Sequence, residues 1–430
     1  MNGFKLKEGF LLGVATAATQ IEGGETDNNW LDWYKKGNIS DGSSPARAND
    51  HYNRYEEDIS LMKSLDIEVC RFGIEWARIE PEDGAFDDAA IEHYRKEIKL
   101  MIKSGIKPLL TLHHFSNPMW FERKGGFENE ENIPIFLRFV EKAVLSFGDL
   151  VSDYNTINEP NVYAMNGYFF GVWPPAKKSM AAAAKVMSVM TACHIKSYEI
   201  IHRVRSEMGF DDSNVSFANH VRAFVPKRKN NLWDRFCSSF SENFFQGAIT
   251  KAMCTGVCSF PLKKIGSYQK GVYCDYIAVN YYTRSSVKGL SDSVKDNAPV
   301  NDLGWEIYPD GIVECAKKLY AVVKKPIYVT ENGTCDASDS FRSRYVYEHL
   351  KAISESELPF ERYYQWCFCD NFEWVEGESA RFGIVYVDYE TQKRTVKKSG
   401  EFYKKIILDK GVSEKLYDEY VKDQKYNYNN

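Results

Sequence analysis

Short apolar runs recur along the chain, separated by longer stretches in which apolar residues return every three or four positions. Most of these runs are nearly continuous in apolar character, which is typical of strands buried on both faces. The eight runs cover residues 10–15, 67–76, 107–115, 153–158, 214–219, 275–282, 326–331 and 363–371. They predict eight parallel strands.

The stretches between the runs have helical periodicity, clearest in residues 51–65, 88–105, 131–148 and 309–325. In the first of them, Ile59, Met62 and Leu65 fall near one face, with charged residues opposite. Strands that alternate with amphipathic helices indicate a parallel sheet covered by helices.

Eight such units favour an α/β fold, a single (β/α)₈ TIM barrel with inserted loops, over residues 1–422. Residues 423–430, "DQKYNYNN", are expected to be a disordered tail. The alternative is a doubly wound open sheet. That fold favours a glycine-rich phosphate turn after an early strand, and residues 13–20, "GVATAATQ", do not provide one.

Composition narrows the function classes. The chain has 430 residues, 44% of them apolar, and a formal net charge of −5 with both signs interspersed. These values favour a globular protein without a nucleic-acid or membrane partner surface. The apolar core of the N-terminus, residues 10–12, is shorter than the roughly 7–15 residues of a signal peptide. We therefore expect a cytoplasmic protein.

Ten cysteines are scattered along the chain, several of them inside strand or helix patterns. In a chain of this size, such cysteines are more often reduced and buried than paired. The pairs Cys254/Cys258 and Cys367/Cys369 lack further ligands at zinc-like spacing. We expect neither a metal nor a cofactor.

In a barrel of this kind, catalytic groups gather where the strands end. Two of the predicted strands end in a glutamate beside an asparagine, at Glu159 and Glu331. A single strand-terminal glutamate is more often an ion-pair partner or a helix cap, but two together suit glycoside hydrolysis, which uses a pair of carboxyl groups. The other polar or aromatic candidates near these ends are Gln20, Arg71, His113, His114, Asn158, Asn280, Tyr282, Trp366, Glu373 and Trp374.

Two short motifs carry a family resemblance. "TINEP" (156–160) and "YVTENG" (328–333) resemble the signature segments of glycoside hydrolase family 1, the β-glucosidase family. The resemblance runs nearly end to end. Further matching segments follow in family order at residues 10–24, 50–65, 71–81, 280–283 and 370–388.

The resemblance implies a retaining, two-step mechanism. Glu159 would be the acid/base and Glu331 the nucleophile, supported by Arg71, Tyr282 and Asn280. A guanidinium close to Glu331 would lower the pKa of this carboxyl and keep it ionised. The two carboxyl groups of a retaining enzyme are expected about 5–5.5 Å apart.

The resemblance also implies a sugar site. Asn158 would bind the 2-hydroxyl, Glu373 the 4- and 6-hydroxyls, and Trp366 would lie beneath the ring. The remaining contacts would come from Gln20, His114, Trp374 and the loop around Trp120. His114 is preferred over His113 because "LHHF" aligns with the family's "LYHW" at its second member.

The stretch after the eighth strand predicts the sugar class. Relatives that act on 6-phosphoglycosides carry a Ser, Lys and Tyr set there, whereas "NFEWVEGESARFG" (371–383) has no lysine and would repel a phosphate through Glu373 and Glu376. We therefore expect unphosphorylated small β-glucosides, galactosides or fucosides and exo action. A transglycosidase and a non-catalytic sugar-binding member are the alternatives, and the oligomeric state is left open.

Some positions depart from the commonest family pattern. Phe115 and Ser116 replace the usual Trp-Asp, and Gly73 and Glu75 replace serines in the second strand, where Cys70 precedes Arg71. None of these changes removes a catalytic group, so we expect them to reshape only the walls of the site.

Overall fold

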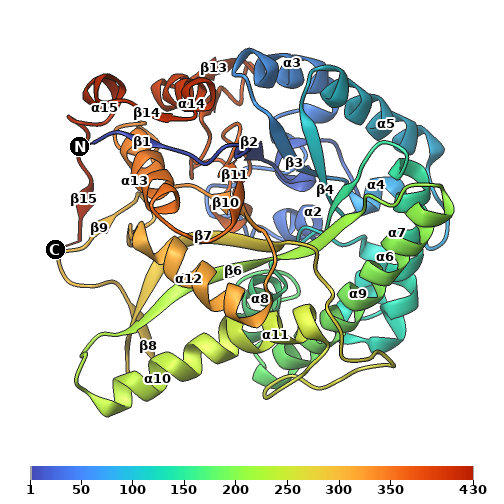
Figure 1. Ribbon diagram of the computed structural model, residues 1–430. Coiled ribbons are helices and arrows are strands. Elements are labelled where there is room, and N and C mark those ends of the chain that lie inside the picture. Colours follow the sequence, from blue (N-terminus) through green and yellow to red (C-terminus); the bar gives the residue numbers. More distant parts are fainter. Residues whose placement is uncertain (1, 430) are drawn as a thin grey trace.

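A closed barrel of eight parallel strands forms the centre of the computed structural model, which describes residues 2–429 (Figure 1). Each strand pairs with the next, and the last pairs back with the first. This arrangement confirms the barrel prediction and excludes the open sheet. In ring order the strands are β2 (Leu11–Ala15), β3 (Val69–Gly73), β4 (Lys107–Thr111), β5 (Asp153–Asn158), β6 (Asn214–Pro226), β7 (Ile277–Lys288), β10 (Ile327–Asn332) and β11 (Phe360–Trp366).

Amphipathic helices surround the barrel and bury the outer faces of its strands. In α5 (Asp88–Lys103), the buried residues Ile91, Tyr94, Ile98 and Met101 recur at helical spacing. The other long helices are α3 (His51–Ser64), α7 (Ile133–Phe147), α9 (Met180–Glu207), α11 (Ala248–Thr255), α12 (Asp310–Val322), α13 (Arg342–Ser354) and α14 (Lys398–Asp409). The shorter helices are α1 (Ala18–Ile21), α2 (Asn29–Lys35), α4 (Trp76–Ile79), α6 (Met119–Arg123), α8 (Pro160–Ala164) and α15 (Glu414–Tyr420).

Two barrel strands continue well past the ends predicted from the sequence. β6 and β7 stay paired as far as Pro226 and Val287, and β8 (Ser291–Ser293) turns back against β7. Helix α10 (Leu232–Glu242) lies beside this extension, at the lower edge of Figure 1. The extension therefore projects from the same end of the barrel at which the strand-terminal glutamates lie.

The C-terminal segment differs from the prediction of a disordered tail. Strand β15 (Asn427–Tyr428) pairs with β9 (Pro299–Val300). Tyr426 is buried against Phe341 and donates a hydrogen bond to Glu348 (2.8 Å). A polar sequence is ordered here because its backbone completes a small sheet and one aromatic ring is buried. Residue 430 lies outside the described residues.

Candidate active site

The two glutamates lie at the carboxyl ends of strands on different sides of the barrel. Glu159 directly follows β5 and precedes α8, with a left-handed φ of +43°. Its backbone N–H donates to the carbonyl of Ala218 on β6 (2.7 Å). Glu331 lies within β10. Both side chains are buried and line one cavity of about 800 Å³.

Glu331 is held by two donors. The Arg71 guanidinium forms an ion pair with Oε1, and the Tyr282 hydroxyl donates to Oε2 at 2.6 Å. Burial nevertheless raises the pKa of Glu331 to about 7, helped by the charge of Glu159 and opposed by Arg71 and Tyr282. The expectation of a lowered pKa is thus wrong, because desolvation outweighs the guanidinium.

A buried network joins the two glutamates. Arg71 donates to Asn158 Oδ1 (2.6 Å), which also accepts from the Asn280 amide (3.0 Å). The same Asn280 amide donates to Glu159 Oε1 (2.8 Å). Arg71, Asn158 and Asn280 are fully buried and lie behind the cavity wall. They fix the orientation of the two carboxyl groups relative to each other.

Glu159 has a second neighbour that the sequence reasoning missed. His220 Nδ1 lies 3.3 Å from Glu159 Oε1, and the Arg222 guanidinium donates to His220 Nε2 at 3.1 Å. Burial lowers the pKa of His220, which favours a neutral ring. Because Nε2 accepts from Arg222, the proton of a neutral ring is on Nδ1, facing Glu159. The apolar run predicts a strand over residues 214–219, which ends one residue before His220, whereas β6 continues through it.

His114 and His113 occupy different environments. His114 lines the cavity, and its Nε2 lies 2.9 Å from the Asn158 amide. Burial, Arg71 and His113 keep the pKa of His114 well below its usual value, so the ring is neutral and carries its proton on Nδ1. His113 instead bonds Asn117 and packs on Phe127.

A third carboxyl group lies at the opposite end of the cavity from His220. Glu373 Oε2 accepts from the Gln20 amide at 3.1 Å. Burial and the charge of Glu331 raise the pKa of Glu373 to about 8. Gln20 is fully buried, and among residues 2–429 its Oε1 has no hydrogen-bond partner. Glu373 lines the cavity and can hydrogen-bond a hydroxylated ligand, whereas Gln20 lies behind the cavity wall and orients Glu373.

Aromatic rings enclose this end of the cavity. Trp366 and Trp374 both line it and stack beside His114, with ring centroids 6.0 and 5.8 Å away. Trp120 does not contribute as expected: its indole N–H donates to the Glu80 carbonyl, and its ring packs on Trp76 away from the cavity.

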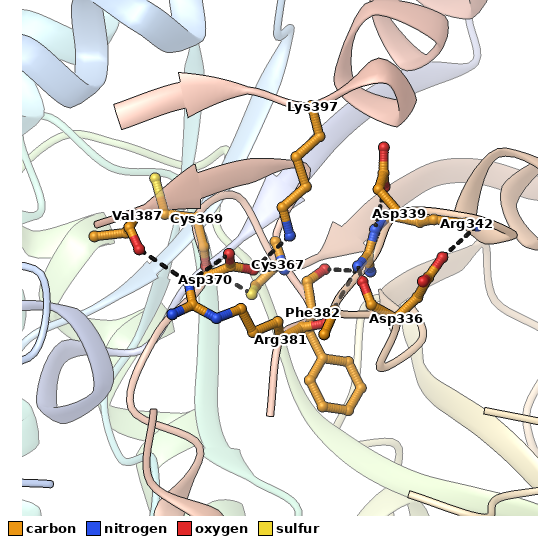
Figure 2. Close-up of polar contacts among 12 residues, drawn as sticks. Asp336, Asp339, Arg342, Cys367, Cys369, Asp370, Arg381, Phe382, Val387 and Lys397 are labelled. Atoms are coloured by element: carbon orange, nitrogen blue, oxygen red, sulfur yellow. Dashed lines mark hydrogen bonds and ion pairs between the residues drawn. The ribbon is translucent and has the colours of Figure 1, made fainter. Parts of the chain in front are cut away.

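Buried ion pairs anchor the loop that follows β11 and carries Glu373. Figure 2 shows Lys397 and Arg381 pointing toward Asp370, with Nζ 2.8 Å and Nη1 3.1 Å from its carboxylate oxygens. Asp370 also accepts from the backbone N–H of Gly383 (2.9 Å). These contacts join the two ends of the loop to each other and to the start of α14, and thereby hold Glu373 at the cavity.

Two of the family departures compensate each other. Ser116 donates to Glu75 Oε1 (2.9 Å), and Thr19 donates to Glu75 Oε2 (2.5 Å). A carboxylate after β3 and a hydroxyl after β4 thus satisfy each other. The acid and the serine have exchanged places relative to the commonest family pattern.

Three further features of the described residues concern metal binding, membrane spanning and the cysteines. Residues 2–429 contain no group of three His, Cys, Asp or Glu side chains placed to hold a metal ion. In the same range, no helix has both the length and the apolar character to cross a bilayer. All ten cysteines are unpaired, as predicted.

Comparison with known proteins places these features in a family. The model of glycosyl hydrolase family 1 matches residues 3–412. β-Glucosidase A of Thermotoga maritima is 31% identical over 96% of this chain and 100% of its own length. A β-glycosidase structure from Pyrococcus horikoshii superimposes with a TM-score of 0.87 at 33% identity, covering 97% of this chain and 98% of the other.

A structure of the Thermotoga maritima β-glucosidase in complex with glucoimidazole also has a TM-score of 0.87, at 30% identity, over 95% of this chain and 100% of the other. Since the family model matches residues 3–412 and relatives of 30% identity or more match nearly the whole chain, the chain belongs to glycosyl hydrolase family 1 and is a glycoside hydrolase.

Proposed function

We propose that the protein is a retaining, exo-acting β-glycosidase that cleaves small unphosphorylated β-glucosides, galactosides or fucosides. The observation that carries the proposal is the pairing of Glu331, held by Arg71 and Tyr282, with Glu159 in one cavity. Arg71 and the Tyr282 hydroxyl favour the ionised form of Glu331. Glu159 has one carboxyl oxygen, Oε2, that is free to carry a proton.

In the first step, ionised Glu331 attacks the anomeric carbon while Glu159 protonates the leaving oxygen. Asn280 and His220 both face Glu159 Oε1. Among the described residues Oε2 has no hydrogen-bonded partner, so Oε2 is the oxygen that carries the proton. In the second step, Glu159 accepts a proton from water, and the ester to Glu331 is hydrolysed.

The sugar would occupy the end of the cavity lined by Glu373, His114 and Trp366, with Gln20 buried behind Glu373. The Glu373 carboxyl accepts and His114 Nδ1 donates, so the site offers partners of both kinds to hydroxyl groups. Its acidic character opposes a phosphorylated sugar. Glu373 and Glu376 line the cavity, and the lining residues include no lysine. Both polar atoms of the Asn158 amide already contact protein groups, and Asn158 does not line the cavity. Asn158 would therefore affect binding of the 2-hydroxyl only indirectly, through the residues that it contacts.

A panel of 4-nitrophenyl β-glycosides, phosphorylated and unphosphorylated, tests the function. We expect cleavage of the unphosphorylated set and a loss of about 10⁴-fold or more in kcat for Glu331→Ala. In Glu159→Ala, azide should restore turnover of an activated substrate and give a β-azide product. Wild-type turnover by Glu331→Ala, or an α-azide, would overturn the proposal.

A further inference from the structure

The cavity changes character between its two ends. Glu331, Glu373 and His114 lie at the sugar end, whereas most residues of the wall beyond Glu159 are aromatic or aliphatic, with Arg222 and Asp292 paired to each other. This wall includes Phe170, Val172, Phe240, Phe244 and Leu290. In the two-step mechanism the leaving group departs from the side of the acid, so the apolar wall faces the aglycone.

Four aromatic rings continue this wall out of the cavity along α10 and the turn after it. Trp233, Phe236, Phe240 and Phe244 stack in order, with centroid separations of 5.6, 6.4 and 6.0 Å and nearly parallel planes. Their spacing of three or four residues places them on one helix face. We call these four residues the aromatic strip.

The strip passes from solvent into the active site. Trp233 and Phe236 are 55% and 60% exposed, Phe240 is 38% exposed, and Phe244 is buried. Phe240 and Phe244 line the catalytic cavity itself. At 1.5 Å per residue the strip spans roughly 16 Å. Large aromatic residues are usually buried, and an exposed row of them marks a surface that binds apolar groups.

Phe245, the residue after Phe244 of the strip, packs close to the acid. His220, beside Glu159, packs edge-on against Phe245 (5.7 Å between centroids), and Phe245 packs against Phe224. Phe224, Phe245 and Phe244 all line the cavity. Aromatic residues therefore line the cavity from the neighbourhood of Glu159 to the inner end of the strip, which continues to the exposed end of α10.

We propose that the aromatic strip binds the aglycone of the substrate and that this aglycone is a long, extended hydrocarbon chain. The proposal rests on the glycosidase function proposed above and specifies its substrate class as an amphiphilic β-glycoside. The continuity of the strip with the catalytic cavity selects this occupant. A cation in this wall would favour an anionic aglycone. The guanidinium that lines it, that of Arg222, is already engaged by His220 and Asp292.

Alkyl β-glycosides of increasing chain length test the inference, each used below its micelle concentration and with the sugar that the nitrophenyl panel favours. We expect kcat/KM to rise at least about 10-fold from the methyl to the dodecyl glycoside, because each methylene buried against the strip adds favourable transfer free energy. The double variant Trp233→Ser/Phe236→Ser should lose most of this rise and keep wild-type activity on the methyl glycoside. Leu145→Ser, which removes an equally exposed side chain (57%) from α7, is the matched control and should behave as wild type.

Binding to Glu331→Gln, measured by calorimetry, separates the two proposals. Glycosides that bind but are not cleaved by the wild type would refute the glycosidase function alone. Dodecyl glycoside that binds no more tightly than methyl glycoside, or equally well when Trp233→Ser/Phe236→Ser is added, would refute the inference alone. Loss of a dimer in sedimentation of the double variant, with unchanged chain-length dependence, would assign the strip to a second copy and also overturn it.

Discussion

His220 and Glu159 meet across two neighbouring barrel strands, with His220 Nδ1 3.3 Å from Glu159 Oε1. The Asn280 amide approaches the same oxygen. Two donors on one carboxyl oxygen fix the rotation of the group and leave Oε2 free to protonate the leaving group in the proposed mechanism. His220 is therefore a positioning residue that acts through Glu159.

Removal of this contact should impair proton donation selectively. In His220→Phe, which keeps a ring against Tyr282, we expect kcat/KM to fall about 10-fold for alkyl or phenyl glycosides, whose leaving groups need a proton. For 2,4-dinitrophenyl glycosides, which leave without one, the loss should be less than about 3-fold. An equal loss for both classes would mean that His220 acts only on folding or sugar binding.

The raised pKa of Glu331 predicts the acidic limb of the pH profile. With a pKa of about 7 in the free enzyme, kcat/KM should fall about tenfold for each pH unit below 7, since only ionised Glu331 attacks. The Tyr282 hydroxyl favours the ionised form. In Tyr282→Phe the limb should therefore move to higher pH, by about 0.5–1 unit. A limb that stays in place or moves to lower pH would contradict this assignment.

Glu373 should make stability depend on pH. Its folded pKa is about 8, against an ordinary value of 4.5. The protonated form suits the site, so its contribution is full below about pH 4.5 and is lost as pH rises through about 8. Glu373→Gln lacks this titration. We expect equal melting temperatures at pH 4.5 and a variant more stable by about 1–3 kcal/mol at pH 9, the range being reduced by the partial exposure of Glu373. A variant less stable at pH 9 would refute the account.

The Asp370 ion pairs predict a coupled effect on stability and sugar binding. Lys397→Met leaves Asp370 buried with Arg381 as its remaining cation. We expect a loss of about 1–3 kcal/mol in unfolding free energy, measured by denaturant titration, and a higher KM because the Glu373 loop loosens. Adding Asp370→Asn should recover part of the lost stability. If the double variant is less stable than the sum of the single changes, the two charges do not act as a pair.

The barrel could be predicted from the sequence because its strands are buried on both faces and its helices on one, which gives two distinct periodicities. The extension of β6 and β7 could not, since beyond Asn219 and Tyr282 the pairing continues outside the barrel, where polar residues such as Arg222 and Arg284 interrupt the apolar run. The ordered tail was missed for a similar reason: backbone pairing of β15 with β9 leaves no apolar pattern.

The site was predictable in part. Strand ends and family motifs identified the glutamates and Arg71, whose contacts depend on position in the barrel. The pKa of Glu331 depends on how much burial offsets Arg71, and the partnership of Glu75 with Ser116 depends on two loops meeting. Neither the pKa of Glu331 nor the contact between Glu75 and Ser116 can be read from a motif.

Trapping of the glycosyl-enzyme tests the central claim most directly. The protein is incubated with an activated 2-deoxy-2-fluoro β-glycoside of its preferred sugar, digested, and the labelled peptide is sequenced by mass spectrometry. A stoichiometric ester on Glu331, absent from Glu331→Gln, is the result that the two-step mechanism predicts. A label on Glu159, or turnover of the native substrate with inversion of anomeric configuration, would contradict it.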